Sequence, residues 1–193
     1  MNAKPTDRPQ ELLNPPAPFL VDSLHQLPRG KALDVAAGRG RNALYLAQHG
    51  FSVHALDRDP AALQTLQTLT GEQNIQNVTT EVVDLESGPV SESVFPASTY
   101  DVVLVFLYLF RSLFPALLRT LKPGGMIVYE TFLVENHLRY HHPRHREFCF
   151  AAGELRTLVS ELHILHYDEG ERPRPDGQPG TFTVRLLAQK KTP

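Results

Sequence analysis

The chain has 193 residues, a formal charge of −2 and a sequence pI near 6.5. This length is typical of one domain with a buried core, and this charge argues against a nucleic-acid partner, which favours a basic surface. The only cysteine, Cys149, excludes a disulfide within the chain and fits a reducing compartment, while the longest apolar run, residues 102–110, is too short to cross a bilayer.

A proline-rich start precedes an alternation of helix-like and strand-like segments. Residues 1–18 are polar and rich in proline, which predicts a flexible arm ahead of a single domain over 19–193. The elements expected next, in chain order, are a short lead-in helix at 19–27, a strand at 31–36, a helix at 43–49 capped by Asn42, a strand at 51–56, and a helix at 61–69 that Asp59 and Pro60 begin and Gly71 ends.

The second half of the chain continues this alternation and then changes. The expected elements are a strand at 78–83, a turn-rich stretch without assignment at 86–99, an apolar strand at 100–106, a helix at 112–121 that Pro123-Gly124-Gly125 closes, and a strand at 126–131. After the long segment 132–150 come a helix at 154–162 and two strands at 163–167 and 181–188, joined by the loop RPRPDGQPG.

Five short apolar strands separated by helices predict a doubly wound, Rossmann-like α/β fold with a mostly parallel sheet. The last two strands have no helix between them, so they predict a C-terminal antiparallel hairpin that brings the sheet to seven strands. In such sheets a ligand binds beyond the carboxyl ends of the strands, where the strand order reverses.

Two glycines, Gly38 and Gly40, separate the first strand from the next helix in the stretch LDVAAGRGRNALYLA, residues 33–47. A glycine there lets the backbone approach a ligand closely, and Asp57, ending the second strand, is placed to accept hydrogen bonds from a ribose diol. The same residues fit the dinucleotide pattern G-x-G-x-x-G/A, which keeps NAD as an alternative. Asp34 lies four residues before Gly38, where a carboxylate disfavours a pyrophosphate and favours a positively charged ligand such as S-adenosylmethionine.

These residues resemble the class I S-adenosylmethionine-dependent methyltransferases over roughly residues 19–188. The glycine turn is similar to the D-x-G-x-G-x-G loop of that family, with Ala36 in place of the first glycine, and LKPGGMIVYETF is similar to its turn into the fifth strand. The nearest likeness is to the small tellurite-resistance and thiopurine methyltransferases. The resemblance implies that Asp57 holds the ribose and that Asp84 and Leu85 meet the adenine. The residues expected to bind the cofactor are Asp34, Ala36, Gly38, Gly40, Asn42, Asp57, Arg58, Asp84, Leu85 and Phe106.

The fourth strand runs into VFLYLFRS, which lacks the N/D-P-P-Y/F motif of methyltransferases that act on nucleic-acid bases. We therefore expect a small-molecule methyl acceptor, such as a thiol or another soft nucleophile, and methyl transfer by in-line displacement. The segment 132–150, with four histidines and three arginines, is a candidate lid or substrate loop, with a solvated loop as the plain alternative. Its arginines disfavour a cation, so no metal is expected. The candidate catalytic residues are Tyr108, Tyr129 and His141.

Two other classes of protein fit the same residues. A sensor or partner subunit would hold S-adenosylmethionine without catalysis, because the glycine turn and the acids indicate only that a cofactor binds. A protein that binds NAD is the third hypothesis. For the favoured methyltransferase we expect a cytoplasmic monomer or homodimer with no nucleic-acid and no membrane partner.

Overall fold

The computed structural model describes residues 15–88, 91–173 and 180–192. Its centre is a seven-stranded sheet in the order β3-β2-β1-β4-β5-β7-β6. Strand β7 runs in the direction opposite to that of the other six strands. The strands are β1 (Lys31–Val35), β2 (Ser52–Asp57), β3 (Val78–Val82), β4 (Tyr100–Phe106), β5 (Leu121–Phe132), β6 (His163–Arg172) and β7 (Thr181–Gln189). The predicted doubly wound α/β fold with a terminal antiparallel hairpin is confirmed.

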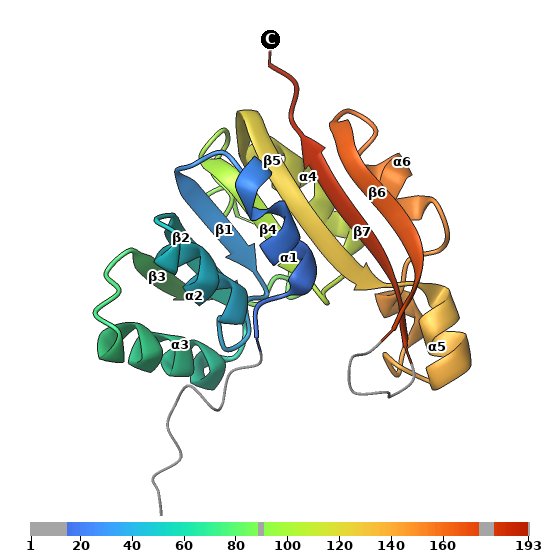
Figure 1. Cartoon of the computed structure of the whole chain (residues 1–193), viewed down its shortest axis with the longest axis horizontal. Helices are drawn as coiled ribbons and strands as arrows, with labels where there is room; N and C mark the ends of the chain where they lie inside the picture. The colour runs from blue at the N-terminus through green and yellow to red at the C-terminus, as the bar shows by residue number, and fades with distance from the viewer. Residues whose placement is uncertain (1–14, 89–90, 174–179, 193) are drawn as a thin grey trace, which may run out of the picture.

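Helices cover both faces of this sheet, as Figure 1 shows. The helices are α1 (Pro18–Ser23), α2 (Arg41–Gln48), α3 (Pro60–Glu72), α4 (Phe114–Thr120), α5 (Val134–Tyr140) and α6 (Glu154–Leu158). Helices α1, α2 and α3 lie on one face, α4 and α6 on the other, and α5 lies beyond the end of β5 (Figure 1). None of the helices in the described ranges is long and apolar enough to cross a membrane.

The core has two halves because successive side chains of a strand point to opposite faces. Val102 and Leu104 of β4 pack toward α1, α2 and α3, whereas Val103 and Val105 pack toward α4 and α6. All four side chains are fully buried. Burial on both faces explains why the strand reads as one continuous apolar run in the sequence.

Several local predictions about helix ends were wrong; the helix expected at 154–162, for example, ends at Leu158. Gly71 lies inside α3, which continues to Glu72. Helix α4 ends at Thr120, and Pro123–Gly125 belong to β5 instead of closing the helix. The segment 132–150, the candidate lid or substrate loop, contains α5 and a 3₁₀ turn at Arg146–Phe148.

Asn42 does not cap the second helix, which begins one residue earlier at Arg41 with Gly40 as the N-cap. Its side chain is buried, and its Oδ1 accepts a hydrogen bond of 2.9 Å from the backbone N–H of Ala17. Residues 1–14 of the predicted arm lie outside the described residues. Ala17 is buried and Pro18 begins α1, so these two residues belong to the folded domain.

We expect Asn42→Ala to lower the free energy of unfolding by about 1–3 kcal/mol, because the buried N–H of Ala17 would lose its acceptor. Gln48→Ala is the matched control, since Gln48 is an exposed residue of the same helix whose amide donates a hydrogen bond to Gln73 at the surface. Urea denaturation of both variants measures the difference. If both variants lost the same small amount of unfolding free energy, Asn42 would not be the residue that holds α1.

Candidate functional site

A cavity of about 410 Å³ lies at the carboxyl ends of the parallel strands. It spans the place where the strand order reverses between β1 and β4, the usual ligand position in such sheets. The lining residues follow β1, β2, β3, β4 and β5 and continue into the segment after α5: Ala36, Asp57, Arg58, Val83, Asp84, Leu85, Glu86, Leu107, Tyr108, Leu109, Phe132, His142, Pro143 and Phe148. Five separate strand ends thus contribute to one site.

The two glycines of the turn after β1 serve different purposes. Both have positive φ angles, +56° at Gly38 and +79° at Gly40. A Cβ at Gly38 would meet no atom within 4 Å, whereas a Cβ at Gly40 would lie 2.5 Å from Cδ1 of Leu66 in α3. Gly40 therefore permits close packing of α2 on α3, and Gly38 leaves open space beside the turn.

Ala36 lines the cavity with a φ of +55°, a left-handed conformation that costs an L-residue roughly 1–2 kcal/mol. The replacement of the family's glycine by Ala36 therefore adds a methyl group and also backbone strain. The backbone has the glycine conformation even though the residue is alanine. Strain of this kind is concentrated at ligand sites, where the surrounding structure maintains it.

Asp57 joins the glycine turn to the end of β2. Its Oδ2 accepts a hydrogen bond of 2.7 Å from the N–H of Gly38, and its Oδ1 accepts one of 2.9 Å from the N–H of Asp59. A carboxylate has about four acceptor positions, so Asp57 retains acceptor capacity where it lines the cavity.

Asp34 is buried directly behind this turn, and its Oδ2 has no hydrogen-bond partner in the described part of the chain. Burial raises the pKa of this carboxyl from its ordinary 3.8 to about 7, and the nearby Asp57 adds to the rise. The backbone N–H of Ala43 and the charge of Arg41 oppose it. A cationic ligand beside the turn would stabilise the ionised form of Asp34.

The end of β4 forms the middle of the cavity wall. Leu107 follows the strand with a φ of +56° and is 50% exposed, although it is a large apolar residue. The Tyr108 hydroxyl is buried without a hydrogen-bond partner among the described residues. Burial raises the pKa of Tyr108 above its usual range, and the carboxylate of Glu86 raises it further. Tyr108 therefore stays protonated at neutral pH and can donate a hydrogen bond.

The cavity contains only some of the residues predicted to bind the cofactor. Ala36, Asp57, Arg58, Asp84 and Leu85 line it. Gly38 does not line it but donates a hydrogen bond to the lining Asp57, and Asp34 is buried. Gly40, Asn42 and Phe106 do not line it either: Gly40 lies against Leu66 of α3, Asn42 bonds Ala17, and Phe106 belongs to the half of the core under α1, α2 and α3.

Of the three candidate catalytic residues, one lines the cavity and two do not. Tyr108 lines the cavity. Tyr129 is fully buried, and its hydroxyl donates a 2.8 Å hydrogen bond to the backbone carbonyl of Tyr108, so it supports the wall from behind. His141 ends α5 in a left-handed conformation, and the lining residue is the next one, His142.

Sequence reasoning missed part of the wall. Glu86, Leu109, Phe132, His142, Pro143 and Phe148 all line the cavity. The proposed substrate segment 132–150 contains four of these six residues, so the segment was the available signal. In the described part of the chain, no three His, Cys, Asp or Glu side chains are grouped as metal ligands would be.

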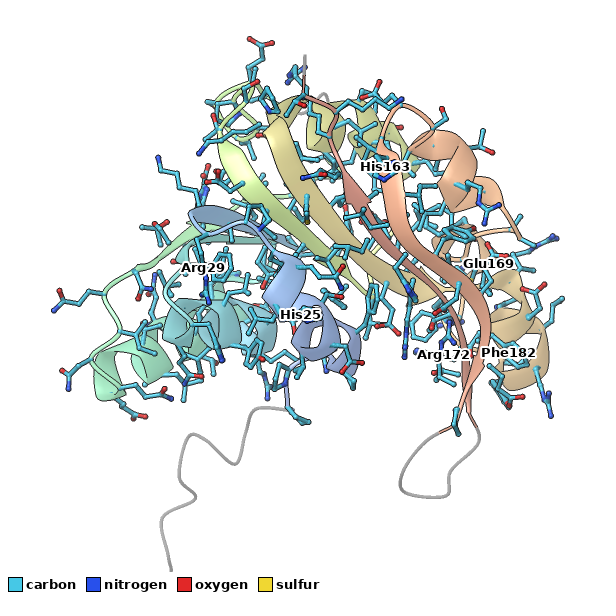
Figure 2. All side chains as sticks on the ribbon, turned by 45° about the horizontal axis from the view of Figure 1, so that its top comes forward. His25, Arg29, His163, Glu169, Arg172 and Phe182 are labelled. Atoms are coloured by element: carbon cyan, nitrogen blue, oxygen red, sulfur yellow. The ribbon has the colours of Figure 1, made fainter. Side chains whose placement is uncertain are left out.

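Hydrogen bonds hold the segment 132–150 against the sheet at both of its ends. Asn136 of α5 is buried, and its Oδ1 accepts from the N–H of Phe182 in β7. Figure 2 shows Phe182 and Arg172 at the end of the β6–β7 hairpin beside α5. At the other end, Arg111 binds the carboxylate of Glu154 and donates to the backbone carbonyls of Glu147 and Cys149.

The strand order, the antiparallel β7 and the cavity at the β1–β4 reversal define the class I methyltransferase fold. The chain belongs to the TehB family: the family described as tellurite resistance protein TehB matches residues 18–186.

Known proteins of this family and fold are similar to most of the chain. A Haemophilus influenzae protein named "Probable S-adenosyl-L-methionine-dependent methyltransferase TehB" is 26% identical over 184 residues, which is 89% of this chain and 61% of the relative. The crystal structure of TehB from Haemophilus influenzae has a TM-score of 0.72 at 22% identity, covering 89% of this chain and 61% of that one. A methyltransferase from Methanosarcina mazei has a TM-score of 0.69 at 18% identity, covering 93% and 100%.

The chain thus spans about three fifths of the length of the curated relatives that it matches.

We expect Asp34→Asn to remove a pH-dependent penalty on folding. Well below its ordinary pKa of 3.8 the carboxyl is protonated in both folded and unfolded chains. As the pH rises toward 7, the unfolded chain ionises first and the wild type loses stability. The total loss is on the order of 4 kcal/mol. Unfolding free energies of the wild type and Asp34→Asn, measured from pH 4 to 8, should therefore diverge. Asp22→Asn, at an exposed residue of α1, removes the same charge without burial. Parallel curves for the wild type and Asp34→Asn would contradict this assignment.

Proposed function

We propose that the protein transfers a methyl group from S-adenosylmethionine to a small-molecule acceptor. The observation that carries the proposal is a single cavity with two chemically different ends. Acidic residues that follow β2 and β3 line one end, namely Asp57, Asp84 and Glu86. Apolar and aromatic residues that follow β4 and β5 line the rest, among them Leu107, Phe132 and Phe148.

The acidic end is suited to the nucleoside part of the cofactor. Asp57 offers carboxylate oxygens to the ribose hydroxyls, and Asp84 with Leu85 offers a carboxylate and an apolar contact to the adenine. S-adenosylmethionine carries an ammonium and a sulfonium and has no phosphate. Three carboxylates around the cavity and the buried Asp34 behind it favour that charge over the pyrophosphate of NAD.

The apolar end is suited to the acceptor. S-adenosylmethionine supplies a methyl group on a positively charged sulfur, and in-line displacement requires chiefly that the acceptor be held in position and that water be excluded. Well-oriented reactants reach effective molarities of about 10⁵–10⁸ M. Leu107, Phe132 and Phe148 can provide such a water-poor wall, which favours a soft, weakly hydrated nucleophile such as a thiol.

The comparisons support the same activity. The curated Haemophilus influenzae relative carries a methyltransferase name. The TehB family match, residues 18–186, includes the cavity-lining strand ends. Binding without catalysis and binding of NAD are the competing outcomes, which the following experiment separates.

We expect Asp57→Asn to weaken S-adenosylmethionine binding by roughly ten- to a hundredfold, because hydrogen bonds to a charged acceptor contribute about 1.5–3 kcal/mol. Isothermal titration calorimetry of the wild type and the variant measures the change, with S-adenosylhomocysteine and NADH as further ligands. Asp59→Asn is the matched control, because Asp59 caps α3 two residues away and asparagine caps equally well.

Unchanged affinity in folded Asp57→Asn would remove this residue from the site. Binding of NADH alone would contradict the methyltransferase proposal. Tight S-adenosylmethionine binding without product from thiols, selenite, tellurite or small amines would favour a sensor or partner subunit.

A further inference from the structure

We propose that His142 is the catalytic residue that accepts the proton of a neutral acceptor, and that the acceptor is a small thiol. This inference rests on the proposed methyl transfer. The geometry points to His142 because its ring lies in the cavity wall at the apolar end while its backbone is held by neighbouring side chains.

Two residues of α5 fix the position of His142. The buried Asn136 donates from Nδ2 to the carbonyl oxygen of His142 at 2.5 Å, and Nδ1 of His137 lies 2.9 Å from the carbonyl oxygen of Pro143. The same Asn136 accepts from the N–H of Phe182, so α5, the histidine segment and β7 share one anchor. His142 is thus fixed through its backbone, which leaves its ring nitrogens for a ligand.

The ring of His142 is oriented by an aromatic neighbour. It stands edge-on to Phe132 with ring centroids 4.9 Å apart and an interplanar angle of 87°. Both residues line the cavity. Neither ring nitrogen forms a hydrogen bond within residues 15–88, 91–173 and 180–192. A side chain held in place but unpaired at a ligand cavity is available for proton transfer.

The other titratable and charged groups around His142 are less suited to accept this proton. Across the cavity stand the cation Arg58 and the carboxylates Asp57, Asp84 and Glu86, which lie at the acidic end. Tyr108 keeps its own proton because burial raises its pKa. On the elements packed against His142, Nδ1 of His137 is already engaged, and the sequence neighbours His141 and Arg144 do not line the cavity.

The reaction balances without any further reagent. A lone pair of the thiol sulfur forms a bond to the methyl carbon while the bond from that carbon to the sulfonium breaks, and its electrons stay on the departing sulfur. The thiol proton passes to a ring nitrogen of His142. Because His142 is exposed at the mouth of the cavity, it can then release the proton to solvent.

The lining also selects the kind of acceptor. A thiol is nearly apolar and weakly hydrated, so it can enter a site walled by Phe132, Phe148 and Leu107 at little desolvation cost. It is also largely protonated at neutral pH and reacts as the thiolate. The apolar wall cannot accept the thiol proton, so a separate residue is needed to form the thiolate.

The test compares two thiols of different acidity in two variants. 2-Mercaptoethanol is protonated at neutral pH and needs a base, whereas thiophenol is largely ionised and does not. We expect His142→Asn to lower kcat/KM for 2-mercaptoethanol by about 10²–10⁴-fold and to leave thiophenol nearly unchanged. His141→Asn is the matched control, because asparagine tolerates the left-handed conformation of residue 141; it should leave both thiols unchanged.

Other outcomes of this test would contradict either the role of His142, the thiol acceptor or the proposed function. An equal loss for both thiols in a folded His142→Asn variant would make His142 a packing residue, and no loss for either would remove it from the reaction. A wild type that binds S-adenosylmethionine in the calorimeter but methylates neither thiol would overturn the acceptor assignment. Absence of S-adenosylmethionine binding by the wild type would overturn the proposed function itself.

Discussion

The hydrogen bond from Gly38 to the Asp57 carboxylate is the contact on which the geometry of the cavity depends. It connects the turn after β1 to the end of β2, two strands that already pair along their length. Because β1 pairs with β2 on one side and with β4 on the other, this turn lies at the reversal point of the sheet. The bonded carboxylate therefore stands at the centre of the strand ends that line the cavity, and it keeps acceptor capacity.

The opposite wall is held by side-chain hydrogen bonds as well as by backbone bonds to the sheet, such as the one from the N–H of Leu133 to the carbonyl oxygen of Phe182. Asn136 connects α5 and the histidine segment to β7, and Arg111 connects the following residues to Glu154 and to the backbone near Phe148. The glycine turn thus lies directly at the end of the sheet, while the segment 132–150 adds a helix and a 3₁₀ turn beyond the end of β5.

Several features around the cavity lower the stability of the folded chain. Ala36 and Leu107 have left-handed backbones, Leu107 exposes an apolar side chain, and Asp34 is an acid buried without a full set of partners. These departures gather where five strand ends meet, whereas the two halves of the core consist of ordinary buried aliphatic and aromatic residues. Their concentration at one place is the physical reason to regard the cavity as a functional site.

The sequence by itself determined the order of the seven strands, most of the helices between them, the terminal hairpin and the acids at the strand ends. Apolar periodicity and glycine turns are local signals, and Asp57 had to follow β2. Tertiary structure alone decided which residues of the segment 132–150 reach the cavity. Helix α5 ends at Tyr140, and His141 follows in a left-handed conformation, after which His142 lies in the wall. It also decided that Asn42 holds α1 instead of capping α2, and that Tyr129 lies behind the site. These assignments depend on contacts between residues far apart in the chain, which no local pattern encodes.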